Sequence, residues 1–100
     1  MATFLAEAYL SRAGAGELRD TALRAQSAAE SMTGEGTPIR FLRVIFLGDE
    51  ETCFHVYEAE SPELVEEASR RAAIPVERVI AALDVDLSTA PDGARLPKED

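Results

Sequence analysis

Four segments of the chain carry hydrophobic patterns typical of β-strands. Residues 3–10, 52–59 and 79–85 alternate between two sets of side chains, and residues 39–47 form an apolar run interrupted by two arginines. Such patterns favour strands because successive side chains of a strand point to opposite faces. The polar segment 48–51, Gly-Asp-Glu-Glu, predicts that the two middle strands form a β-hairpin.

Two other segments have helical spacing. Residues 17–32 place small apolar side chains three or four positions apart, and the glycines and proline of 34–38 are expected to end this helix. Ser61 and Pro62 are typical of a helix start, with Ser61 able to cap the first amides, so we expect a second helix over 61–73. Pro75 is expected to open a short extra turn.

The order strand, helix, strand, strand, helix, strand predicts an α+β, ferredoxin-like βαββαβ fold. Right-handed crossovers close this order into a four-stranded antiparallel sheet with two helices on one face, and the first and third strands become central neighbours. A chain of 100 residues is long enough for one core. We expect the domain to span 1–86 and a disordered acidic C-terminal tail to span 87–100.

The purely apolar side chains are expected beneath the helices. We therefore place Phe54 and Val56 on the covered face, because a register slip would bury the guanidinium of Arg43. The open face then carries Leu5, Glu7, Tyr9, Phe41, Arg43, Ile45, Cys53, His55, Tyr57, Ile80 and Ala82. An apolar surface of this size is rarely left in water. It predicts a homodimer of the dimeric α/β-barrel type, with a cavity between two open faces.

Cys53 and His55 are the only cysteine and the only histidine of the chain. Two positions apart on a strand, they share a face with about 6.5–7 Å between their Cα atoms, so both donors can reach one metal ion. Glu7 on the neighbouring strand adds a carboxylate. A set of imidazole, thiolate and carboxylate suits zinc, nickel or copper. The pattern predicts a divalent metal site of His55, Cys53 and Glu7.

The same face also supports a metal-free enzyme or small-molecule binding protein. His55 has the titration range of a general acid or base, and Tyr57 and Arg43 can orient a small carbonyl or phenolic substrate. The expected pocket wall comprises Tyr9, Phe41 and Ile45. A third interpretation is a structural dimer without a ligand, in which Cys53 is a small buried hydrophobe. Whether the protein is an enzyme is left open by these residues.

Charge and cysteine content narrow the partners and the compartment. The formal net charge is -9 and the ten basic residues are scattered, which argues against binding to nucleic acid or to an anionic membrane. No apolar run is long enough to cross a membrane, and the N-terminus lacks the pattern of a signal peptide. A single cysteine cannot form an intramolecular disulfide, so we expect a cytoplasmic protein.

Three segments carry a family resemblance: GTPIRFLR at 36–43, ETCFHVYEA at 51–59 and RAAIPVERVI at 71–80. With them the chain resembles, over about residues 3 to 85, a family of small, largely uncharacterised ferredoxin-like proteins that includes a nickel-binding protein. The resemblance implies a dimeric α/β barrel and divalent metal binding, with nickel as the expected ion. The wider barrel group also contains cofactor-free oxygenases, cyclases and dehydratases, which keeps the enzymatic alternative open.

Overall fold

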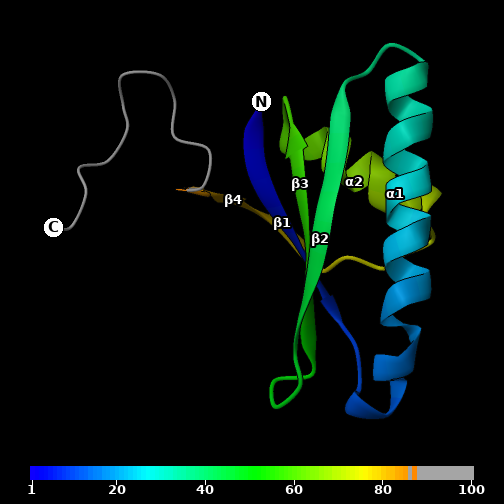
Figure 1. Cartoon of the computed structure of the whole chain (residues 1–100), viewed down its shortest axis with the longest axis vertical. Coiled ribbons are helices and arrows are strands. Elements are labelled where there is room, and N and C mark those ends of the chain that lie inside the picture. Colours follow the sequence, from blue (N-terminus) through cyan, green and yellow to red (C-terminus); the bar gives the residue numbers. More distant parts are fainter. Residues whose placement is uncertain (86, 88–100) are drawn as a thin grey trace, which may run out of the picture.

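The computed structural model describes residues 1–85 and 87. Its elements are β1 (Ala2–Tyr9), the 3-10 helix η1 (Arg12–Glu17), α1 (Leu18–Gly34), β2 (Ile39–Leu47), β3 (Thr52–Ala59), α2 (Pro62–Arg71) and β4 (Arg78–Ala82). The strand order is β2-β3-β1-β4, and every neighbouring pair is antiparallel. Figure 1 shows α1 and α2 on one side of the sheet. The predicted ferredoxin-like α+β fold is confirmed.

Helix α1 lies close to the sheet because its buried stripe is made of small side chains. Ala25, Ala28 and Ala29 are buried together with Met32. The helix is followed by Gly36, whose φ of 100° is strained for residues with a side chain. The chain then turns directly into β2, so the glycines and proline of 34–38 act as the sequence predicts.

Helix α2 and strand β4 differ in detail from the sequence expectation. Pro62 occupies the first turn of α2, but the Ser61 side chain makes no capping hydrogen bond with any residue that the structure describes. The described chain also has no helical turn at Pro75. Strand β4 ends at Ala82 rather than at Val85, because it runs antiparallel to β1 and reaches the first residues of that strand there: Ala82 pairs with Thr3, one residue inside the start of β1.

The predicted face of strand β3 is wrong. Ala8 pairs with Cys53, Ala6 with His55 and Phe4 with Tyr57. Because directly opposed residues of an antiparallel pair share a face, these three β3 residues lie beneath the helices with the core residues of β1. Phe54 and Val56 therefore lie on the open face, opposite Glu7 and Leu5.

The pairing of β2 with β3 explains why the prediction failed. The prediction placed Arg43 on the same face as Cys53 and His55, but the hairpin pairs Leu47 with Thr52, which puts Phe46 opposite Cys53 and Val44 opposite His55. The prediction treated β2 as a regular strand, in which Phe41 and Arg43 share a face. The structure has a register shift between them: Phe41 pairs with Tyr57 and Arg43 with Val56. Leu42 is the extra residue, so Phe41 turns inward while Arg43 stays on the open face. The bulge therefore explains the inward position of Phe41, whereas the β2–β3 register sets the face of Cys53 and His55.

The tail predicted over 87–100 lies outside the described residues, except for Leu87. The domain boundary near residue 86 therefore stays a prediction. Among the described residues, no helix has the length and apolar character needed to span a membrane.

Candidate functional site

A cavity of about 200 Å³ lies between the sheet and the N-terminal half of α1. Strand β3 contributes Cys53 and His55, and the helical side contributes Glu17, Thr21 and Arg24. The remaining lining residues are Ala8, Tyr9 and Leu10 at the end of β1 and Ala73, Ile74 and Pro75 after α2. Cys53 and His55 thus share a cavity, but it is on the covered side of the sheet.

His55 is buried without a hydrogen-bond partner. Its residue is 1 % exposed, and neither Nδ1 nor Nε2 is hydrogen-bonded to any residue that the structure describes. Burial lowers the pKa of His55, the backbone of Ala6 opposes this shift, and the charge of Arg24 lowers the pKa further. The imidazole is therefore neutral near pH 7, with a free lone pair.

Cys53 is a buried thiol next to this imidazole. It is 3 % exposed, and burial raises its pKa above the ordinary value. Phe46 lies opposite Cys53 on β2, and the ring of Phe41 lies 6.2 Å from the ring of His55. Metal binding here would have to release the thiol proton, because the thiolate is the ligand. The apolar surroundings keep both side chains uncharged in the absence of such a ligand.

Arg24 closes one wall of the cavity. Its Nη1 donates to the carbonyl oxygens of Ala72 at 2.6 Å and Ala73 at 3.3 Å, and its Nε donates to Asp20 Oδ2 at 3.2 Å. These carbonyls stand at the C-terminal end of α2, where a cation is favoured. Arg24 therefore joins the two helices and also brings a positive charge close to His55.

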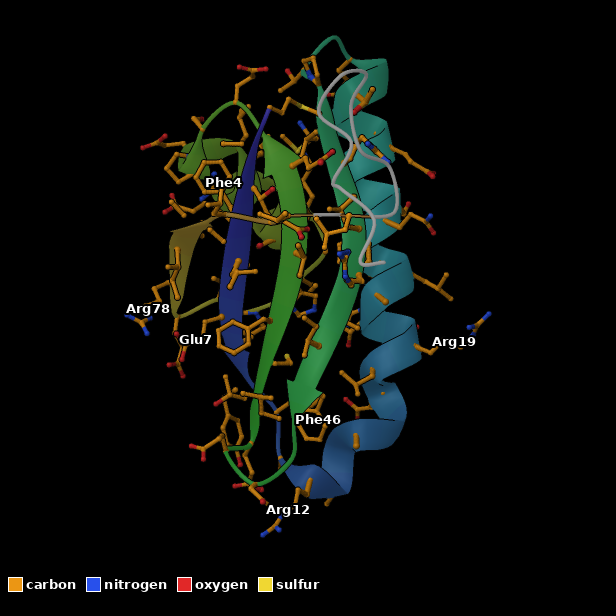
Figure 2. All side chains as sticks on the ribbon, turned by 60° about the vertical axis from the view of Figure 1, so that its left-hand side comes forward. Phe4, Glu7, Arg12, Arg19, Phe46 and Arg78 are labelled. Carbon is orange, nitrogen blue, oxygen red and sulfur yellow. The ribbon has the colours of Figure 1, made fainter. Side chains whose placement is uncertain are left out.

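The other predicted site residues are dispersed. Glu7 lies on the open face and forms an ion pair with Arg78, as Figure 2 shows. Arg43 also lies on that face, where it pairs with Asp84 at 3.4 Å. Ile45 is an exposed residue of the open face. The structure therefore does not bring Glu7 together with His55 and Cys53.

The three predicted aromatic residues have three different positions. Tyr9, at the end of β1, is largely exposed but also lines the cavity. Tyr57 is fully buried, and its Oη has no hydrogen-bond partner among the described residues. Burial raises the pKa of Tyr57 to about 12, with Ser69 acting in the opposite direction. Phe41 packs against Tyr57 with 5.4 Å between ring centroids.

Glu17, Thr21 and Arg24 are cavity residues that the sequence analysis missed. They are spaced four and three positions apart, so they lie on one face at the start of α1. In the sequence, the signal for these cavity residues was a polar stripe that runs beside the alanine stripe of α1. Even with Glu17, no three or more His, Cys, Asp or Glu residues in the described part of the chain lie close enough together to hold a metal ion.

Residues 10–81 match the model of a protein family described as nickel responsive protein SCO4226-like. The match covers more than half of the chain and includes β2, β3 and both helices. No curated protein and no solved structure gave a significant match.

Proposed function

The chain belongs to the SCO4226-like family of nickel-responsive proteins, and from this premise we propose that it binds a divalent transition metal, nickel first, through Cys53 and His55. One observation carries the proposal: the buried imidazole of His55 has two unpartnered nitrogens and lines a cavity together with Cys53. A buried polar group without a partner is rare in proteins and calls for an explanation.

The donor types fit a transition metal, but the donor number is low. A neutral imidazole and a thiolate are ligands for nickel, zinc and copper. Since the described residues offer no third His, Cys, Asp or Glu within reach, the other coordination positions would be filled by water or by an external ligand. The cavity of about 200 Å³ has room for such groups.

The metal-free alternative receives less support. Of the residues expected to line the substrate cavity or act on the substrate, His55 and Tyr9 line the observed cavity, while Tyr57 lies in the core and Arg43 on the open face. The cavity is also smaller than the roughly 300–1,000 Å³ typical of sites for small organic molecules. An ion with one or two small ligands fits this space better.

We also propose that the protein is a homodimer whose subunits pack through their open faces. Tyr9, Ile45 and Leu47 are exposed on this face, and Leu83 and Val85 follow β4 as further exposed hydrophobics. Asp84 between them pairs with Arg43, so this segment lies over the same face. Burial of this apolar surface would stabilise a dimer. We propose a cytoplasmic setting, where reducing conditions keep Cys53 a thiol.

Titration of the metal-free protein with Ni²⁺ tests the metal proposal. We expect thiolate-to-nickel charge-transfer absorption in the native protein and its loss in Cys53→Ser, with weaker binding in His55→Ala. Glu7→Gln is the matched control, because Glu7 lies on the opposite face and its variant should bind as the native protein does. Equal binding by native protein and both site variants would contradict the proposal.

Sedimentation velocity tests the dimer separately. Ile45→Asp places a charge in the open face and should convert a dimer into a monomer, whereas Leu23→Asp, at an exposed position of α1, should not. A native protein that sediments as a monomer at all concentrations would rule out the open-face dimer.

A further inference from the structure

We propose that Cys53 and His55 form a site for a soft monovalent ion, Cu(I), which they hold more tightly than Ni(II). This inference rests on the proposed function only in using the same two donors. It concerns the identity of the ion, for which the cavity gives its own physical evidence.

The number and type of donors favour Cu(I). Nickel(II) prefers square-planar or higher coordination, so two protein donors leave it dependent on weakly held external ligands. Cu(I) is a closed-shell ion that is stable at low coordination number and prefers thiolate sulfur. The cavity supplies one sulfur and one nitrogen from residues two positions apart, and the described part of the chain adds no third His, Cys, Asp or Glu within reach.

The charge of the cavity also favours Cu(I) over Ni(II). A thiolate and Cu(I) together are neutral, whereas a thiolate and Ni(II) leave one positive charge in a buried site. That charge would lie near Arg24, whose guanidinium also lines the cavity. Glu17 lines the cavity as well, and because Glu17 and Arg24 are both solvent-exposed, the charges of both side chains are partly screened. A buried excess charge is costly, which selects the monovalent ion.

The surroundings of the two donors are apolar and aromatic. His55 lies between Ala6 and Val44 on the neighbouring strands, with the ring of Phe41 at 6.2 Å. Phe46 and Ala8 flank Cys53 in the same way. A neutral ion–thiolate pair is compatible with such walls, because it requires no compensating charge from the protein.

Two matched titrations test the inference. Cu(I), supplied without oxygen as its bicinchoninate complex, and Ni²⁺ alone are each titrated against the native full chain. We expect Cu(I) to bind at least about tenfold more tightly than Ni²⁺, and Cys53→Ser to lose about a hundredfold or more of the Cu(I) affinity. Residual Cu(I) binding in Cys53→Ser reports the thioethers of Met1 and Met32, which are the other sulfur atoms of the chain.

Arg24→Gln tests the charge argument. Removing the guanidinium charge should raise the affinity for Ni²⁺ more than the affinity for Cu(I), so the difference between the two affinities should become smaller. A ring-nitrogen NMR spectrum of the native protein supplies a measurement independent of variants, because His55 is the only histidine. Cu(I) should shift its signals at one equivalent.

The outcomes separate this inference from the proposed function. If Ni²⁺ binds through Cys53 and His55 and Cu(I) binds no more tightly, the Cu(I) inference is overturned and the nickel proposal stands. If neither ion shifts the His55 signals, both are overturned. Cu(I) binding that is equal in the native protein and Cys53→Ser would be a surface site and would also reject the inference.

Discussion

The two faces of the sheet differ in whether their polar side chains have bonding partners. On the open face, Glu7 is paired with Arg78 and Arg43 with Asp84. On the covered face, His55 and Tyr57 are almost fully buried, yet no described residue accepts or donates a hydrogen bond to their ring nitrogens or hydroxyl. The charged side chains of the open face therefore have ion-pair partners, whereas His55 and Tyr57 on the covered face have no hydrogen-bond partners among the described residues. Unsatisfied polar groups in a core reduce stability, which is why they indicate a function.

The largest difference between the faces is expected for aromatic truncation. Tyr57→Ala should lower the free energy of unfolding by about 3–5 kcal/mol, because it leaves a cavity in the fully buried core. Phe54→Ala, on the open face of the same strand, should cost clearly less. Urea denaturation of both variants measures the comparison, and equal losses would mean that the two faces are equally packed.

The second prediction concerns pH and the covered face. Because burial lowers the pKa of His55 below its ordinary value of 6.5, the unfolded chain binds a proton at a higher pH than the folded chain. The contribution of the neutral His55 imidazole to the free energy of unfolding is therefore complete above about pH 6.5. It is lost as the pH falls, by at most about 1.4 kcal/mol per pH unit. Unfolding free energies between pH 7 and pH 5.5 measure this slope.

His55→Gln is the control for the pH prediction. With no other histidine in the chain, this variant should show little slope over the same interval. The carboxyls of Glu35 and Glu67, whose pKa values are lowered chiefly by hydrogen bonds from Arg71, lose their stabilising effect only at lower pH. A slope that persists in His55→Gln would show that another group titrates.

Removal of the Tyr57 hydroxyl should have a smaller effect of opposite sign. Tyr57→Phe deletes a buried Oη that has no partner among the described residues, so the variant should be as stable as the native protein or more stable by about 1 kcal/mol. Thermal and urea unfolding measure the change. A loss of more than about 1 kcal/mol would reveal a hydrogen bond to this hydroxyl, for which the Ser69 side chain is the candidate, because it lowers the pKa of Tyr57.

The smallest effect is expected on the open face. Glu7→Gln breaks the ion pair with Arg78, and exposed pairs contribute only about 0.2–1 kcal/mol. The difference from the native protein should shrink further at high salt, because salt screens exposed charges. Denaturation at two ionic strengths tests this, and a larger, salt-independent loss would show that Glu7 is as important as the buried face.

Sequence patterns predicted the elements better than their faces. The periodicity identified the four strands and both helices, because the hydrophobic pattern of each element extends over enough residues to be recognised. The face of β3 could not be obtained in this way, because both sets of its side chains are apolar enough to be buried: Phe54 and Val56 on one side, Cys53 and Tyr57 on the other. The choice between them depended on the register of the β2–β3 hairpin, in which Leu47 pairs with Thr52. The inward position of Phe41 depended on a bulge at Leu42, for which the local sequence has no glycine or other signal.

The candidate site was predicted only in part for the same reason. Cys53 and His55 lie together, because residues two positions apart share a face in either register. Glu7 was added from the assumed face of β3 and lies on the other side of the sheet. Arg24 was not foreseen, because its position in the cavity depends on how α1 packs against the end of α2, which is a tertiary contact.

The bulge at Leu42 makes the site sensitive to chain length. Deletion of Leu42 would restore a regular strand. The side chains on one side of the deletion would then point to the opposite face of the sheet from the one they have now. Either Phe41 would leave the core or Val44 and Phe46 would turn away from the helices. Such a deletion would change how Phe41 and Val44 pack against His55. Insertions and deletions in β2 are therefore expected to alter the cavity that Cys53 and His55 line, while the rest of the sequence stays the same.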